Sequence, residues 1–142
     1  MNIKRSKKFS KILKFRYVGN MHGNEPVGRQ LILYLAEYLL KNYGKDDRVT
    51  EIVDTTEIYL MPSMNPDGFE ESPEGFCGGS YGRKNGNGQD LNRDFPRRWK
   101  YSAGSDKVKE MEKGRQPETL AMMRWILNEP FVLVCHFFII EY

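Results

Sequence analysis

The alternation of strand-like and helix-like segments restricts the fold of this chain more than any other feature. Residues 15–21 form a loosely alternating apolar run that predicts a strand. Asn24 then suits the cap of a helix, and Pro26 suits its first position. Apolar residues recur at helical spacing from there, and Gly44 marks the end of the expected helix. The apolar positions of this helix are Val27, Leu31, Tyr34, Leu35, Tyr38 and Leu39.

The rest of the chain continues the same alternation. Residues 55–64 predict a second strand, closed by a turn at 65–68. After a long loop over 69–113, Pro117 starts a second expected helix, and residues 131–140 predict a strand that is apolar on both faces. This order predicts an α/β layer architecture with largely parallel strands. The buried stripe of the second helix is expected at Leu120, Met123, Ile126 and Leu127.

Length and composition place the chain among ordinary one-domain globular proteins. It has 142 residues, of which 39% are hydrophobic and 29% charged, with a formal net charge of +3. Basic residues gather in 1–13, which we expect to be a disordered lead, but no nucleic-acid motif accompanies them and nucleic acid is not an expected partner. No signal-peptide pattern is visible, and no apolar run reaches the roughly 20 residues that span a bilayer. The sequence indicates no particular oligomeric state.

His22 and Glu25 are candidates for one face of a zinc site. They lie three residues apart where the first expected strand gives way to a helix, so both side chains can reach one ion. Catalytic zinc commonly takes three protein ligands, often two histidines and a glutamate, and leaves a position for water. His136 is the other histidine of the chain and the candidate for the third ligand. The alternative is a helix start at which the carboxylate of Glu25 interacts favourably with the helix dipole.

Arg83 and the pair Asn92-Arg93 are candidates for contacts with a substrate. An arginine fork binds a carboxylate through two hydrogen bonds, and a neighbouring asparagine can donate to the same group. A second arginine beside a metal can stabilise the oxyanion that develops when a carbonyl is hydrolysed. Together these groups can hold a peptide by its free C-terminus. The alternative interpretation is a set of solvated loop charges.

A calcium loop is the main rival motif in the same region. Asp90, Asn92 and Asp94 have its spacing, but Phe95 occupies the position that needs glycine. A phosphate loop and a dinucleotide fingerprint also fail, because the glycines near residues 78–88 lack the required neighbours.

Five blocks in a fixed order resemble the regulatory-type zinc metallocarboxypeptidases, the group of carboxypeptidases D, E, M and N, with D-like repeats the most similar. The blocks are 19–25 (GNMHGNE), 61–68 (MPSMNPDG), 82–85 (GRKN), 90–96 (DLNRDFP) and 116–119 (QPET). The resemblance implies release of C-terminal Arg or Lys from peptides or proteins, in the secretory pathway or outside the cell, on an α/β/α fold with a mixed, largely parallel sheet. It also implies that Zn²⁺ is bound by His22 and Glu25, that Arg83 serves the oxyanion, and that Asn92 and Arg93 hold the terminal carboxylate.

The end of the chain departs from the pattern of this group. An ungapped alignment places the third zinc ligand on Phe138, and His136 stands two residues earlier, about 6–7 Å along a strand. The resemblance covers the N-terminal part of a catalytic domain over 14–133, and residues 134–142 form a divergent apolar tail. We therefore expect a truncated domain with weak or no turnover and poor solubility. The alternative function is a non-catalytic binder of peptide C-termini.

Overall fold

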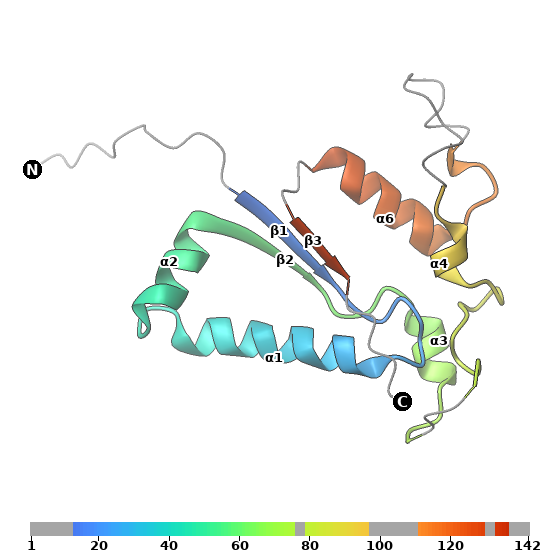
Figure 1. Ribbon diagram of the computed structural model, residues 1–142, viewed down its shortest axis with the longest axis horizontal. Coiled ribbons are helices and arrows are strands. Elements are labelled where there is room, and N and C mark those ends of the chain that lie inside the picture. Colours follow the sequence, from blue (N-terminus) through green and yellow to red (C-terminus); the bar gives the residue numbers. More distant parts are fainter. Residues whose placement is uncertain (1–12, 76–78, 97–110, 130–132, 137–142) are drawn as a thin grey trace, which may run out of the picture.

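The computed structural model describes residues 13–75, 79–96, 111–129 and 133–136, and Figure 1 shows helices on both sides of a small sheet. The strands and helices confirm the expected α/β architecture. In chain order the elements are β1 (Leu13–Val18), α1 (Pro26–Asn42), α2 (Asp47–Thr55), β2 (Thr56–Met61), α3 (Pro66–Glu71), α4 (Leu91–Asp94), α6 (Pro117–Asn128) and β3 (Leu133–His136).

The three strands of the described sheet are parallel, with β1 in the middle and β2 and β3 on either side. Val18 at the end of β1 lies opposite Met61 of β2 and His136 of β3, so the carboxyl ends of the strands meet at one edge. Helices α1 and α6 lie on opposite sides of the sheet (Figure 1), so the helix that follows β1 and the helix that precedes β3 cover different faces. Open α/β sheets bind ligands outside the carboxyl ends of their strands, where the connections on the two faces separate.

The main core lies on the side of the sheet that faces α6. Arg16 of β1 is also buried on this face, and its guanidinium carbon lies 4.8 Å from the ring centre of Trp125. Burial lowers the pKa of Arg16, and the aromatic face compensates in part for the water that the guanidinium loses. The buried cluster ties together the segments that follow β1 and β2 with α4 and α6. Its members are Val18, Met21, Met64, Leu91 and Met122, with Met61, Phe95 and Trp125 packed against them.

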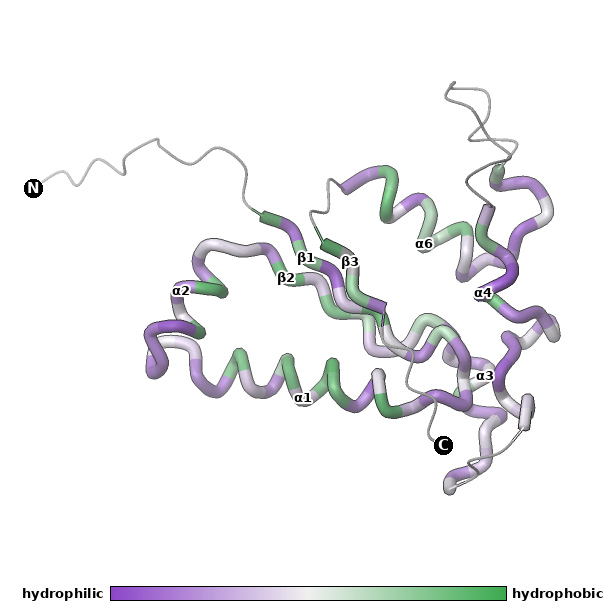
Figure 2. The backbone as a smooth tube through the Cα atoms, viewed as in Figure 1, coloured by the Kyte–Doolittle hydropathy of each residue, from purple (hydrophilic) through white to green (hydrophobic). Residues whose placement is uncertain are grey.

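Helix α1 buries less of its apolar stripe than its sequence pattern indicates. Gly28 and Ile32 are its buried residues, whereas Tyr34 and Tyr38 of the expected stripe are 58% and 54% exposed. Figure 2 shows hydrophobic residues recurring along the whole helix. The helix therefore packs on the sheet along a narrow line and leaves apolar side chains on its flanks.

Helix α6 packs with a face rotated from the expected one. Met123 is buried as expected, but it is accompanied by Thr119 and Met122. Ile126 and Leu127, expected in the buried stripe, are exposed. The buried residues lie in about the first two turns, where α6 meets α4 and the core cluster.

Short capped helices stand where the sequence pattern indicated turns and loops. The turn expected at 65–68 is the first turn of α3, capped by the Asn65 side chain, which accepts a hydrogen bond from Gly68 N–H. Helix α4 lies inside the loop expected over 69–113. Helix α2 was not expected, and Asp46 caps it by accepting from Val49 N–H.

Some expectations fall outside the described residues. These concern the basic lead over 1–12, most of the apolar tail and Phe138. Among the helices that the structure describes, none is both long enough and apolar enough to span a membrane.

Candidate metal centre

The segment that follows β1 stays paired with the segment that follows β2 after both strands end. Gly19 N–H donates to Met61 O at 3.0 Å, and Met64 N–H donates back to Gly19 O at 3.1 Å. Asn65 N–H then donates to Asn20 O at 3.0 Å. These bonds hold the 19–25 loop at the sheet edge where ligands are expected.

Asn20 organises this loop from its centre. The residue is fully buried, and its φ of 55° lies in the left-handed region, which asparagine tolerates better than most residues. Its side-chain amide donates to the carbonyl oxygens of His22 and Gly23 at 2.9 Å and of Glu25 at 3.3 Å. Ser63 Oγ donates to Asn20 Oδ1 at 2.7 Å and thereby fixes which way the amide faces. The backbone that carries both candidate zinc ligands is therefore held by one side chain.

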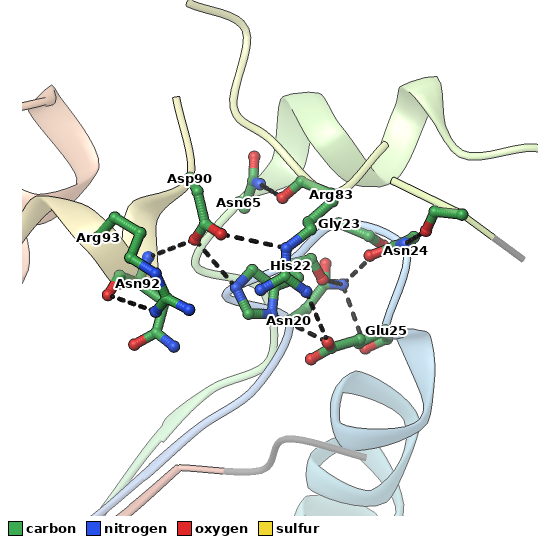
Figure 3. Close-up of polar contacts among 11 residues, drawn as sticks. Asn20, His22, Gly23, Asn24, Glu25, Asn65, Arg83, Asp90, Asn92 and Arg93 are labelled. Carbon is green, nitrogen blue, oxygen red and sulfur yellow. Dashed lines mark hydrogen bonds and ion pairs between the residues drawn. The ribbon is translucent and has the colours of Figure 1, made fainter. Parts of the chain in front are cut away.

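His22 and Glu25 converge inside the loop. Both are buried, and His22 Nδ1 lies 2.9 Å from Glu25 Oε1 (Figure 3). Glu25 Oε2 is also buried and has no hydrogen-bond partner among the described residues. Burying a carboxylate oxygen without a partner is costly, and a bound cation removes that cost. Imidazole nitrogen and carboxylate oxygen are both zinc ligands, so these residues fit the zinc that the resemblance implies.

A close backbone approach brings a third element to the same place. A Cβ on Gly23 would lie 2.0 Å from the carbonyl carbon of Gly68 and 2.3 Å from Gly82 O. Only glycine allows the 19–25 loop to approach α3 and the 82–83 segment so closely. Because Arg83 follows Gly82, this approach places its side chain beside His22 and Glu25.

Arg83 joins the two acidic groups on either side of His22. Its Nε donates to Asp90 Oδ2 at 3.1 Å, and its Nη1 lies 3.5 Å from Glu25 Oε1. The side chain is 29% exposed, so the guanidinium remains accessible to a ligand. Arg83 therefore has the position expected of a cation that assists at a metal-bound carbonyl, and this role stays a prediction.

Asp90 holds the far side of the His22 ring. His22 Nε2 lies 3.1 Å from Asp90 Oδ1, and Asn92 N–H donates to the same oxygen at 2.9 Å. Burial, the largest effect, raises the pKa of the Asp90 carboxyl, but the Asn92 N–H and the charges of Arg83 and His22 outweigh it and the net pKa lies below its ordinary value. A carboxylate at Nε2 favours the histidine tautomer that keeps its proton on Nε2 and directs Nδ1 toward Glu25 as a candidate metal ligand, as in many zinc sites.

His136 lies at the same sheet edge but does not complete a cluster. Its backbone pairs with Val18, and burial, together with the charge of Arg16, lowers the pKa of the His136 imidazole. Among the described residues, no group of three or more His, Cys, Asp or Glu side chains could hold a metal ion. His136 as a third ligand therefore stays a prediction.

Asn92 and Arg93 lie beside Asp90, at the start of α4. Both residues are exposed, and Arg93 Nη1 makes only a long hydrogen bond of 3.4 Å to Asn92 O among the contacts that the structure shows. Figure 3 places them on the other side of His22 from Glu25. A peptide carboxylate at these residues would have its preceding groups close to the histidine and Arg83.

Sequence reasoning missed two residues of this site. Asp90 was considered in a rejected calcium loop and lies within a recognised block, but nothing in the sequence indicates its contact with a histidine 68 residues away. Asn20 lies within a recognised block, but its role depends on the left-handed backbone and on Ser63, which the sequence does not reveal.

A family comparison agrees with this arrangement. The zinc carboxypeptidase family model matches residues 3–138, and the chain therefore belongs to that family, whose members hydrolyse peptides at their C-termini with zinc. The chain is 53% identical to carboxypeptidase D of Anas platyrhynchos over 120 residues and 52% identical to human carboxypeptidase D over the same length. It is 48% identical to carboxypeptidase M of Mus musculus over 122 residues.

The relatives are much longer than the matched stretch. Each match covers 84–86% of this chain, but only 8% of either carboxypeptidase D and 26% of carboxypeptidase M. This chain therefore spans only a small part of the length of the relatives that it matches.

Proposed function

We propose that this chain binds Zn²⁺ through His22 and Glu25 and acts on the free C-termini of peptides or proteins, as a zinc metallocarboxypeptidase by descent. The observation that carries the proposal is the buried His22–Glu25 pair, in which Glu25 Oε2 has no hydrogen-bond partner among the described residues. Asp90 contacts the His22 ring, as a group that orients the histidine would. Arg83 contacts Asp90 and stands near Glu25, where it could assist at the carbonyl group of a substrate.

Each residue has a distinct role in this proposal. When bound, zinc supplies the Lewis acidity that activates water and polarises a carbonyl group. Asp90 holds the proton on His22 Nε2, and Arg83 donates hydrogen bonds to the carbonyl oxygen as negative charge develops on it. Asn92 and Arg93 bind the terminal carboxylate and thus place the last peptide bond at the metal.

The finer assignments rest on the five-block resemblance. It favours C-terminal Arg or Lys as the residue released and the secretory pathway as the compartment. It also predicts weak or no turnover for this chain, because the position aligned with the third zinc ligand holds Phe138.

Hydrolysis of a dansylated peptide that ends in a free Arg tests the proposal, with the C-terminal amide of the same peptide as the matched control. We expect weak or no cleavage of the acid and none of the amide, and any cleavage of the acid should be abolished by a chelator and in His22→Ala. Cleavage that survives both treatments would contradict the metal site assigned here.

A non-catalytic binder is the second candidate, favoured by the exposed Asn92 and Arg93, which do not contact the His22–Glu25 pair in any interaction that the structure shows. It predicts binding of free C-termini that depends on Arg93 and is unaffected by chelator. Equal binding of peptide acids and peptide amides would exclude it.

A further inference from the structure

The QPET block at 116–119 is a prominent motif to which the proposed function gives no role. Its residues form the start of α6, and two of them contact the loop that separates Arg83 from Asp90. The contact is made through Asn85, which is 2% exposed.

Asn85 closes this loop on itself. Its N–H donates to Gln89 O at 2.9 Å, and its carbonyl accepts from Gly88 N–H at 2.8 Å. Its Oδ1 accepts from the N–H groups of Asn87 at 3.2 Å and Gln89 at 2.9 Å. One residue therefore sets the path of the chain over 85–89, and that path fixes how far Arg83 stands from Asp90.

The side-chain NH₂ group of Asn85 attaches the loop to α6. Its Nδ2 donates to Gln116 Oε1 at 2.9 Å and to the two carboxylate oxygens of Glu118 at 3.2 and 3.1 Å. Gln116 N–H also donates to Asp94 Oδ2 at 2.8 Å. The start of α6 thus contacts Asn85, which precedes Asn92 and Arg93, and Asp94, which follows them.

We call Asn92 and Arg93, the proposed ligands of the terminal carboxylate, the carboxylate clamp. We propose that Asn85, held by Gln116 and Glu118, is a positioning residue for this clamp. The start of α6 fixes the 85–94 segment so that Arg93 and Asn92 stand at a set distance from Arg83. The inference rests on the proposed function, because it assumes that these residues bind a C-terminal carboxylate. The His22–Glu25 pair lies on a separate loop held by Asn20, and the 85–94 segment reaches this pair through Asp90, which contacts the His22 ring. We therefore expect the contact to affect the clamp more than the metal ligands.

Exchanging the amide of Asn85 with the carboxylate of Glu118 tests the positioning role of Asn85 in the full chain. Asn85→Asp keeps an oxygen for the turn of the loop but places a carboxylate against Glu118, so the attachment to α6 is lost. Adding Glu118→Gln restores the hydrogen bond in the opposite direction: the new amide at position 118 donates to the new carboxylate at position 85. Asn87→Asp is the matched control, since Asn87 is exposed in the same loop and contacts Gln116 without Glu118.

The measurements are calorimetric binding of a peptide ending in a free carboxylate and of its amide, and zinc per chain for each variant. We expect Asn85→Asp to weaken binding of the acid about 10-fold or more with unchanged zinc. The double variant should return to near the wild-type affinity, and Asn87→Asp should resemble wild type.

Each other outcome overturns the inference in a distinct way. If wild type does not distinguish acid from amide, the proposed clamp fails and the inference fails with it. If wild type distinguishes them but Asn85→Asp binds equally well, or loses zinc in parallel with peptide, only the positioning role fails. If Asn85→Asp does not fold, the double variant decides, and failure to recover both fold and acid binding counts against the proposal.

Discussion

At the scale of single residues, the site depends on Asn20 as much as on the candidate ligands. Three carbonyl oxygens of the 19–25 loop point at one buried amide, and Ser63 holds that amide in the donating orientation. A ligand pair three residues apart can bind one ion only if the backbone between them is fixed. Asn20 provides this constraint in a loop with no regular secondary structure.

Asn20→Asp tests this constraint with almost no change in shape. The substitution removes the donors and turns a carboxylate toward three carbonyl oxygens, so we expect a loss of about 3 kcal/mol in the free energy of unfolding and a loss of bound zinc. Urea unfolding and metal analysis measure the two effects. Asn42→Asp, whose single amide bond to Tyr38 O is exposed, should cost less than about 1 kcal/mol. Equal effects of the two substitutions would show that Asn20 has no special role.

The same residues show how much of the site the sequence can predict. His22 and Glu25 were singled out from their spacing at a strand–helix boundary, and the structure does bring the two side chains together. Arg83 was singled out from its type and its block, and it contacts Glu25 and Asp90. Asp90 as the partner of His22 could not be predicted, since that contact depends on how the 82–90 segment folds back over Gly23.

At the scale of elements, long apolar periodicity was predictable and short capped helices were not. Helices α1 and α6 and strands β1 and β2 stand close to their expected positions. Helices α2, α3 and α4 contain few apolar residues, and each depends on a polar cap from Asp46, Asn65 or Asp90. Such caps are also the residues of turns, so their sequence fits both interpretations.

Strand β1 is attached to its neighbours through Lys14. Its Nζ lies 3.1 Å from Glu57 Oε2 of β2 and 2.5 Å from Glu129 Oε2, just beyond α6. Hydrogen bonds to Glu129 and Glu57 hold the pKa of Lys14 well above its usual range. Bonds from Tyr59 and Lys14 lower the pKa of Glu57. The strand that leads to the metal loop is thus connected to β2 within the sheet and to the end of α6.

The pH dependence of stability follows from these shifts. The contribution of Glu57 is present above its ordinary pKa of 4.5 and is lost as the pH falls through its lower folded value. The contribution of Lys14 is present below 10.5 and is lost as the pH rises through its higher folded value. We therefore expect Lys14→Met to lower the midpoint of urea unfolding at pH 7 and to differ less from wild type at pH 3. Lys41→Met, which removes the exposed contact with Glu37, should change the midpoint little at either pH. If the midpoints of wild type and Lys14→Met differ as much at pH 3 as at pH 7, the ion pair of Lys14 with Glu57 does not stabilise the fold.

At the scale of the whole molecule, a small sheet leaves much apolar surface on its helices. Leu33 and Leu40 of α1 are 43% and 80% exposed, and Tyr34 and Tyr38 lie on the same helix with more than half of their surface exposed. Contiguous exposed apolar surface promotes association between molecules. This observation supports the poor solubility expected from the sequence, although that expectation was drawn from the 131–140 segment.

Substitution of this surface makes the expectation measurable. The double variant Leu33→Glu and Leu40→Lys adds no net charge and should raise the protein concentration at which light scattering detects association. Gln30→Glu with Ala121→Lys places the same charges at exposed positions that are not large and apolar, and it should behave like wild type. A wild-type chain that is a monodisperse monomer at all concentrations tested, with a cooperative melt, would show that the exposed surface does not drive association.

The proposed function requires His22 and Glu25 to hold a zinc ion at the carboxyl edge of the sheet. It is tested most directly by the zinc retained per chain after dialysis of wild type and of His22→Ala against metal-free buffer. We expect wild type to retain about one zinc per chain and His22→Ala to lose it while remaining folded. Equal zinc in the two proteins, or none in a folded wild type, would contradict it.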